Sequence, residues 1–189
     1  MTTLNTLKSL VLAPYILQAM ALIRIHRLVG GNQFRHCFMV LGILLDYKLF
    51  DDSVLLKAAL LHDLFEDIPE TSIDEIRVID SESHDVVDLV LEVTRHQGEL
   101  KEDYLSRILE SGSRNALILK CADRISNITD LHSDTHSDQG ITDYLDQTEK
   151  YVIPMARRVN KDMVTELTDL VAKRRKVLMM MQNGEQENG

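Results

Sequence analysis

Apolar residues recur at spacings of three and four along most of the 189-residue chain, which is the period of an amphipathic helix. No stretch shows the strong alternation of apolar and polar residues that indicates a half-buried strand. The pattern predicts helices at about residues 4–28, 33–50, 51–67, 70–79, 83–96, 99–111, 113–131, 141–158 and 162–181. We therefore predict an all-α fold, a single compact bundle of about eight to nine helices.

Glycine and capping residues mark the boundaries between these helices. The pair Gly30–Gly31 predicts a turn before the second helix, and the run Asp51-Asp52-Ser53 predicts the cap of the third. The polar segment HSDTHSDQG, at residues 132–140, predicts a loop. Because no repeat or linker divides the chain, we expect one domain over residues 1–182 and a disordered polar tail at 183–189.

The composition is that of an ordinary globular protein, with 44% hydrophobic and 27% charged residues. The net charge of −9 argues against general nucleic-acid binding, which needs a basic surface. The two cysteines, Cys37 and Cys121, lie far apart inside apolar helical patterns. They indicate buried free thiols in a reducing compartment rather than a disulfide or a structural zinc site, so we expect a cytoplasmic location.

The N-terminal run loosely resembles a signal peptide, because Lys8 precedes the apolar SLVLAPYIL and the small-residue stretch AMA. Pro14 and Gln18 interrupt the run, and a single lysine is a weak basic region, so we favour a helix that faces the core. No stretch approaches the ~20 apolar residues of a membrane span, and no membrane association is expected.

The segment LLKAALLHDLFEDIPETS gathers one histidine and three carboxylates within six positions: His62, Asp63, Glu66 and Asp67. On a continuous helix, residues four apart share a face, so His62 would stack with Glu66, and Asp63 with Asp67. Like charges this close repel one another, and the helix dipole opposes acidic residues at a C-terminal end. A bound cation explains the cluster; a solvated acidic helix end or a set of salt bridges is the alternative.

Two further polar residues lie inside apolar patterns. His36 is near the start of the second helix and needs a partner, which a backbone carbonyl could also supply. Asp123 follows the apolar ALILKCA, with Asn127 one turn later, and a buried aspartate is rare unless it is paired or binds a metal. Two histidines with two aspartates suit a hard or borderline divalent ion, and we favour Mn²⁺ over Fe²⁺, Mg²⁺ or Zn²⁺.

The order H…HD…D, carried by His36, His62–Asp63 and Asp123, resembles that of the HD-domain metal phosphohydrolases. Three longer stretches, AALLHDLFED, ILKCADRISN and YVIPMARRVN, are similar to the AALLHDxxED, IKLADRxxN and YxPxAxRxx stretches of the RelA/SpoT-homologue hydrolase domain. The spacing from Arg27 to His36 also fits that family. The resemblance spans about residues 19–160 and leaves no room for a synthetase or regulatory domain, so we expect a stand-alone small alarmone hydrolase with an HD-type bundle.

This resemblance implies an enzyme that hydrolyses guanosine 3′,5′-bis(diphosphate) (ppGpp) or pppGpp to GDP or GTP and pyrophosphate, with one divalent metal ion as cofactor. The implied metal ligands are His36, His62, Asp63 and Asp123. The implied catalytic residues are Glu66 and Asp67, which would activate water and handle protons. The implied contacts to the nucleotide are Arg27, by stacking on the base, Asn127 and, with less support, Tyr151.

The sequence also departs from the family pattern on the side that would face the nucleotide. Leu28 replaces a basic residue, Gly31–Asn32 replace Glu–Pro, and Thr129 replaces an arginine. The exact nucleotide therefore stays open. An NADPH 2′-phosphatase, a nucleotidase and a non-catalytic nucleotide-binding module remain as alternatives.

Other residues allow two interpretations each. Arg124 is either a phosphate contact or a structural salt-bridge partner, and Lys101 and Arg107 either meet distal phosphates or are solvated surface charges. The methionine-rich VLMMM at residues 177–181 either packs on its own core or contacts a second copy, so a homo-oligomer stays open.

Overall fold

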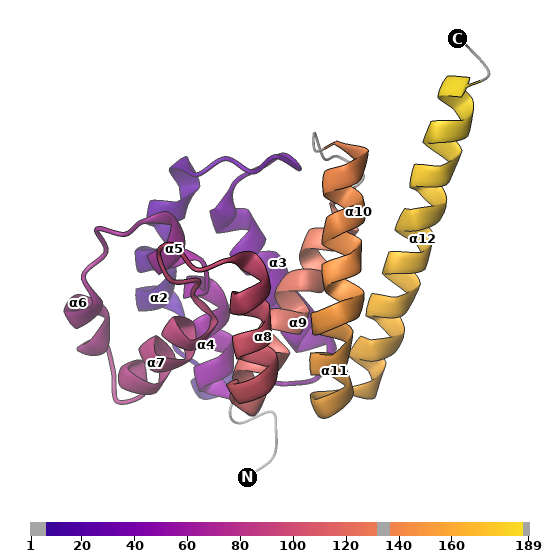
Figure 1. Cartoon of the computed structure of the whole chain (residues 1–189). Coiled ribbons are helices and arrows are strands. Elements are labelled where there is room, and N and C mark those ends of the chain that lie inside the picture. Colours follow the sequence, from indigo (N-terminus) through magenta and orange to yellow (C-terminus); the bar gives the residue numbers. More distant parts are fainter. Residues whose placement is uncertain (1–6, 132–136, 187–189) are drawn as a thin grey trace.

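The computed structural model describes residues 7–131 and 137–186, except for the side chains of residues 182–186. Within these residues the chain forms a bundle of helices without a strand, which confirms the predicted all-α class (Figure 1). No helix in the described part is both long enough and apolar enough to cross a membrane.

Helix α9 (Arg114–Thr129) lies at the centre of the bundle, and the other elements are arranged around it (Figure 1). In chain order these elements are α2 (Ala13–Ala19), the 3-10 helix η1 (Met20–Arg24), α3 (Gln33–Asp46), α4 (Ser53–Leu61), α5 (Leu64–Asp67), α6 (Ile73–Arg77), α7 (Ser83–Val93), α8 (Lys101–Ser111), α10 (Asp138–Gln147), the π-helical turn η3 (Thr148–Val152), α11 (Ile153–Val159) and α12 (Lys161–Gln186). Helix α9 packs against α3, α4, α7, α8, α11 and α12. Side chains on α9 can therefore meet residues from distant parts of the sequence.

The predicted turn and cap before the second and third helices are confirmed. Gly30 and Gly31 have φ angles of +90° and +73°, which favour glycine, and they reverse the chain before α3. Asn32 then caps α3 by accepting a hydrogen bond from the Arg35 amide at 2.9 Å. Asp52 caps α4 in the same way through the Leu55 amide, also at 2.9 Å.

The N-terminal helix predicted for residues 4–28 is wrong in its extent. Pro14 lies in the first turn of α2, where its missing amide proton costs nothing. The chain then tightens into η1 and becomes extended at Ile25. Residues 1–6 lie outside the described part of the chain.

The continuous helix predicted for residues 51–67 is also wrong. Helix α4 ends at Leu61, His62 and Asp63 form a turn, and the short helix α5 begins at Leu64. The break places Glu66 and Asp67 in the first turn of α5, where the helix dipole favours negative charge. In one long helix they would occupy the unfavourable C-terminal end. The interruption therefore resolves the electrostatic conflict seen in the sequence.

The C-terminal part differs from the prediction in its boundaries. Helix α10 begins at Asp138, inside the segment predicted as a loop, and residues 132–136 of that segment lie outside the description. The helix predicted for residues 141–158 is divided by η3 into α10 and α11. Helix α12 continues to Gln186, into the predicted tail, whose last residues, 187–189, are not described. The disordered tail therefore stays a prediction.

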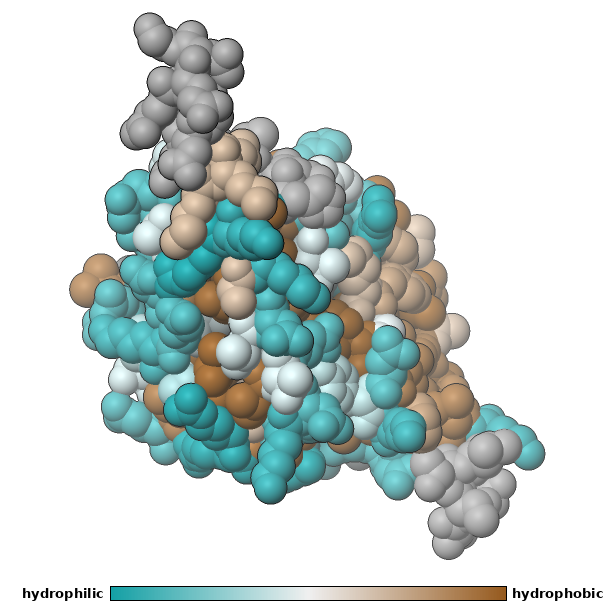
Figure 2. All heavy atoms as spheres, turned by 90° about the vertical axis from the view of Figure 1, so that its right-hand side faces the viewer, coloured by the Kyte–Doolittle hydropathy of each residue, from teal (hydrophilic) through white to brown (hydrophobic). Residues whose placement is uncertain are grey.

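Large apolar side chains are exposed in two main parts of the chain, near its N-terminal third and at the end of α12. They are Leu7, Val11, Leu17, Met20, Ile23, Leu28, Phe38, Val78, Leu100, Val177, Met179, Met180 and Met181. Viewed from the side of α10 and α12, hydrophobic residues gather on the right-hand flank of the molecule (Figure 2). In the VLMMM stretch Leu178 is buried, whereas the three methionines that follow it are exposed.

A lysine is buried on the apolar helix α4. The Lys57 ammonium lies 2.7 Å from Asp80 Oδ2 and 2.6 Å from Glu82 Oε2, and Asp80 Oδ1 accepts a hydrogen bond from the Tyr15 hydroxyl at 2.9 Å. Burial works against the Asp80 carboxylate most strongly, but the hydrogen bonds from Lys57, Tyr15 and the Glu82 amide together outweigh it and lower the pKa of Asp80. A second hydrogen bond from the Lys57 ammonium lowers the pKa of Glu82. This network fastens the loop before α7 to α4.

Replacing Lys57 by methionine should lower the free energy of unfolding by about 2 kcal/mol at pH 7, because Asp80 and Glu82 lose their shared cation. The folded-state pKa values of both carboxylates are lowered, so the stabilisation is present above about pH 5 and is lost as the pH falls through those values. Urea denaturation of both proteins between pH 3 and pH 7 measures the difference. Lys173→Met, on the exposed side of α12, is the matched control; an equal loss in both variants, or a difference independent of pH, would contradict the prediction.

Candidate metal centre and active site

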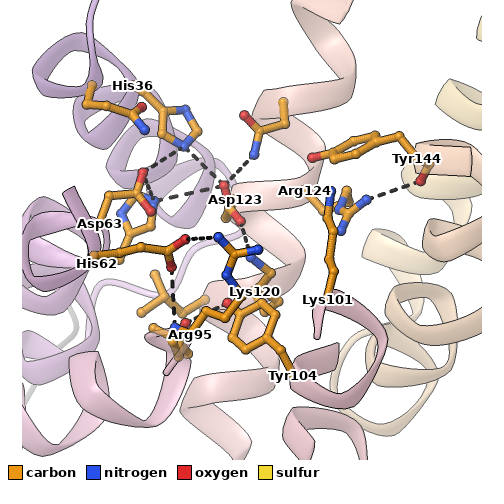
Figure 3. A pocket seen from close by; sticks show the side chains of 15 residues that line it. His36, His62, Asp63, Arg95, Lys101, Tyr104, Lys120, Asp123, Arg124 and Tyr144 are labelled. Carbon is orange, nitrogen blue, oxygen red and sulfur yellow. Dashed lines mark hydrogen bonds and ion pairs between the residues drawn. The ribbon is translucent and has the colours of Figure 1, made fainter. Parts of the chain in front are cut away.

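The structure brings together the four residues predicted to bind a metal. His36 comes from α3, His62 and Asp63 from the break between α4 and α5, and Asp123 from α9 (Figure 3). One ligand atom each of His36, His62 and Asp123 lies within 4.8 Å of the others, and all three residues are buried. Asp63 Oδ2 lies 3.2 Å from His62 Nε2 and 3.7 Å from His36 Nε2. The cluster therefore forms only when three separate segments of the chain pack together.

His62 directs one ring nitrogen into the cluster. Its Nδ1 lies 2.8 Å from the Ala59 carbonyl oxygen, which assigns the proton to Nδ1 and leaves Nε2 facing the carboxylates. Nε2 is buried and has no hydrogen-bond partner among the described residues. Burial disfavours protonation most strongly, but Asp63 and Cys37 together outweigh it and hold the pKa of His62 well above its usual range. A proton and a metal cation would thus compete for this nitrogen.

His36 is oriented by contacts on both ring nitrogens. Nδ1 lies 3.0 Å from Ser126 Oγ, and Nε2 lies 3.0 Å from Asp123 Oδ1. Ser126 and Asp123 are both on α9, so this helix fixes the rotation of the imidazole. The sequence indicated that a buried His36 needs a partner. The structure provides two, the Ser126 hydroxyl and the Asp123 carboxylate, instead of a backbone carbonyl.

Asp123 is 5% exposed and makes contacts through both carboxylate oxygens. Oδ1 accepts a hydrogen bond from Asn127 Nδ2 at 2.5 Å, and Oδ2 lies 2.7 Å from Lys120 Nζ. Burial opposes ionisation of Asp123 most strongly, but Lys120, His36 and His62 together outweigh it and hold the pKa of Asp123 well below its ordinary value. Lys120 was missed in the sequence, although its position three residues before Asp123 on a helix is a recognisable pairing signal.

This donor set fits a divalent metal ion. Two imidazoles and two carboxylates are ligands for borderline and hard divalent ions, and Nε2 of His62 is buried, makes no hydrogen bond within the described residues and faces Asp63 Oδ2 at 3.2 Å. The outer contacts from Ala59, Ser126 and Asn127 hold the ligands in place, as supporting groups do in metal sites.

A cleft with two adjoining cavities opens over the cluster. The first, of about 250 Å³, includes the four clustered residues and Glu66 in its lining. The second, of about 630 Å³, is lined in part by Arg27, Leu28 and Asp67. The residues that line both cavities are Gln33, Lys101, Asn127 and Tyr144. The metal cluster and the larger cavity therefore belong to one continuous site.

Glu66 and Asp67 occupy different environments in this cleft. Glu66 Oε1 lies 3.4 Å from Arg95 Nη2, and its Oε2 accepts a hydrogen bond from the Arg95 amide at 3.3 Å. Burial and the charge of Asp63 raise the pKa of Asp67 to about 6. Near neutral pH, Asp67 therefore carries a proton for an appreciable fraction of the time.

Cations surround the cleft although the whole protein is acidic. Its first cavity is lined by Arg95, Lys101, Lys120 and Arg124 (Figure 3). Burial and the neighbouring cations, Arg124 first among them, lower the pKa of Lys101 to about 8. The ammonium is still largely protonated at pH 7, and its charge is unfavourable where it lies. Such an environment favours a bound anion.

The predicted nucleotide contacts are only partly brought together. Arg27 Nη2 donates a hydrogen bond to Asn127 Oδ1 at 2.5 Å, and its Nη1 lies 3.7 Å from Asp130 Oδ2, so these residues meet at the second cavity. Tyr151 lies elsewhere: its hydroxyl donates to Glu102 Oε2 at 3.0 Å and its ring does not line either cavity. Tyr144, which sequence analysis did not single out, lines both.

The remaining cations have different roles from one another. Arg124 is 2% exposed, lies 3.9 Å above the Tyr144 ring, and donates to the Tyr144 carbonyl and the Thr148 hydroxyl at 3.2 and 3.1 Å. It therefore holds α10 and η3 against α9 while lining the cleft, and among the described residues it makes no salt bridge to an acid, which was one of its two interpretations. Arg107 binds Glu99 at 2.8 Å and neighbouring backbone carbonyls, so it is structural and not a solvated charge.

The sequence model of the HD domain matches residues 34–181, most of the chain. The chain belongs to the HD domain family. A solved structure of a metazoan ortholog of SpoT, which hydrolyses ppGpp and plays a role in starvation responses, is similar to this HD domain with a TM-score of 0.74. The two share 25% sequence identity, and the similarity covers 86% of this chain and 94% of the other. No match was found among curated proteins. The family and the structural neighbour together support a metal-dependent hydrolase.

In this HD domain, Asp123→Asn and Asp63→Ala should each weaken Mn²⁺ binding by more than about tenfold, because a direct ligand matters at least as much as a supporting group. Isothermal titration calorimetry on metal-stripped protein measures the affinity and the stoichiometry, with circular dichroism as the check on folding. Asp88→Asn is the control, since Asp88 is exposed and pairs only with Arg77 on the surface. One equivalent of Mn²⁺ bound at unchanged affinity by either ligand variant would remove that residue from the set.

Proposed function

We propose that this HD domain hydrolyses ppGpp or pppGpp, releasing pyrophosphate from the 3′ position and leaving GDP or GTP. The observation that carries the proposal is the buried cluster of His36, His62 and Asp123, with its unpartnered nitrogen, at the base of a cation-lined cleft. The structural neighbour's ppGpp hydrolysis supports the choice of substrate.

The proposed metal ligands are His36, His62, Asp63 and Asp123, and Mn²⁺ is the proposed ion. A divalent ion in such a site supplies Lewis-acid polarisation of water and of a phosphoryl oxygen. The protein's own contribution is orientation: α9 holds both His36 and Asp123, and the Ala59 carbonyl fixes the ring of His62. Lys120 keeps Asp123 ionised and therefore able to act as a ligand.

The proposed proton carriers are Glu66 and Asp67. Glu66 lines the same cavity as the ligands, and its two contacts with Arg95 hold it there as a base for the attacking water. Asp67, with a pKa of about 6, can hold a proton on its carboxylate and donate it to the departing ribose oxygen.

The substrate's phosphates would face the four cavity cations, and Lys101 is placed between the two cavities to contact them. The nucleoside would occupy the larger cavity with Arg27, Asn127 and Tyr144. Tyr144 offers an aromatic face in place of the predicted Tyr151. Leu28, which lines this cavity and is 60% exposed, adds apolar surface where a cation was expected.

The proposal predicts Mn²⁺-dependent release of pyrophosphate and GDP when metal-stripped protein is incubated with ppGpp. Products from parallel incubations with ppGpp and NADPH, with and without Mn²⁺, are resolved by ion-exchange chromatography. Asp123→Asn should be inactive under all conditions and serves as the control for contaminating enzymes. If orthophosphate is released from NADPH while ppGpp stays intact, the proposed metal-dependent hydrolysis stands but ppGpp is rejected as the substrate. No product from either compound would reject the proposed activity.

The double variant Glu66→Gln/Asp67→Asn should bind Mn²⁺ normally and lose turnover by about a hundredfold or more, because two proton carriers are removed and no ligand is changed. Calorimetry and the ppGpp assay give the two measurements. Asp74→Asn/Glu75→Gln, the same pair of changes on the exposed face of α6, is the control. Wild-type turnover in the Glu66/Asp67 variant would exclude both residues from the mechanism.

A further inference from the structure

A cysteine thiol lies beside the metal cluster. Cys37 follows His36 directly on α3 and is completely buried. Its Sγ and one ligand atom each of His62 and Asp63 all lie within 4.8 Å of one another. Two groups of possible ligands therefore overlap at His62: one with His36 and Asp123, and one with Cys37 and Asp63.

These separations are close to what a single ion requires. Bonds from zinc to nitrogen, oxygen and sulfur are about 2.0–2.3 Å long and its coordination is tetrahedral, so two ligands of one zinc ion are separated by roughly 3.3–3.8 Å, about 1 Å less than the upper limit of 4.8 Å. Small side-chain movements therefore suffice to bring the thiol into contact with an ion at His62. His62 is 5% exposed, and its Nε2, which makes no hydrogen bond within the described residues, lies 3.2 Å from Asp63 Oδ2 in this same group.

The second cysteine shows that this placement is not a general consequence of burial. Cys121 is equally buried, on the central helix α9, but its Sγ contacts the Val152 carbonyl oxygen at 3.7 Å. It does not belong to either ligand group found in the described residues. Cys37 therefore lies at the metal cluster, and Cys121, which is buried away from it, serves as the control residue for experiments on Cys37.

Thiolates and carboxylates prefer different metal ions. Sulfur ligands select ions such as Zn²⁺, whereas Mg²⁺ and Mn²⁺ prefer oxygen ligands. A site with carboxylates on one side and a thiol on the other can therefore bind the two kinds of ion through different ligands.

We propose that Cys37 is a metal-selective ligand, which binds thiophilic divalent ions together with His62 and Asp63, whereas Mn²⁺ is bound by the histidines and carboxylates without Cys37. The inference rests on the metal centre of the proposed function. Binding through Cys37 breaks the S–H bond and releases the proton to solvent as the metal–sulfur bond forms. Because both ligand groups contain His62, a thiophilic ion and Mn²⁺ exclude one another, and the former acts as a competitive inhibitor of metal activation.

Cobalt provides a direct optical test. Titration of the metal-stripped full chain with Co²⁺ should produce a thiolate-to-cobalt charge-transfer band in the near ultraviolet, in addition to the weak visible bands of bound Co²⁺. The charge-transfer band should disappear in Cys37→Ala and persist in Cys121→Ala. Cys37→Ser, which keeps more of the side-chain volume, repeats the test if the alanine variant does not fold by circular dichroism.

Metal affinities provide the second measurement. Cys37→Ala should weaken Cd²⁺ binding by about tenfold or more and change Mn²⁺ binding by less than about twofold. Visible cobalt bands without a charge-transfer band in the wild type, or loss of that band only in Cys121→Ala, would overturn the role of Cys37 and leave the metal centre intact. Failure of the wild type to bind Co²⁺, Cd²⁺ or Mn²⁺ would overturn both this inference and the metal centre.

Discussion

The buried charge of Asp123 is the constraint on which the rest of the site depends. An isolated carboxylate in the middle of a helical bundle is too costly to remain ionised, so its surroundings must compensate for the lost hydration. Lys120 and Asn127 do so from the same helix, and His36 does so from α3. Asn127 also accepts a hydrogen bond from Arg27, which connects the carboxylate to the larger cavity. Compensation of one charge thus organises both halves of the cleft.

The cleft is rich in cations, whereas the protein as a whole is acidic. A protein with a net charge of −9 repels polyanionic nucleotides at long range, yet its cleft contains four cations in the first cavity alone. Screening at physiological salt limits the repulsion to about 8 Å, whereas buried and partly buried cations act at contact distance. Burial and the neighbouring cations lower the pKa of Lys101. A phosphorylated ligand would offset this concentration of positive charge, so the cleft favours an anionic ligand.

Helical geometry is interrupted at two points near the cleft, at His62–Asp63 and at η3, and both interruptions change the direction of nearby side chains. The break at His62 and Asp63 turns both side chains toward α3 and α9, and it moves Glu66 and Asp67 to the favourable end of a new helix. The π-helical turn η3 follows α10, where Arg124 binds the Tyr144 carbonyl and Thr148. Such turns are often found at functional sites because they redirect side chains. Here Tyr144, on α10 just before the π-helical turn, lines the cleft, whereas Tyr151, within the turn, does not.

The sequence by itself determined the all-α class, the turn at Gly30–Gly31, the cap at Asp52 and the identity of the clustered histidines and aspartates. These features depend on local rules, the period of apolar residues and the chemistry of individual side chains, so the order of residues is sufficient to predict them. Only the tertiary structure decided that Arg95 holds Glu66 and that Tyr144 rather than Tyr151 faces the cleft. It also decided that Cys37 lies beside the metal ligands while Cys121 does not. These relations join residues far apart in the chain or depend on the direction of a side chain. Packing of whole helices around α9 sets both, and no local pattern encodes that packing.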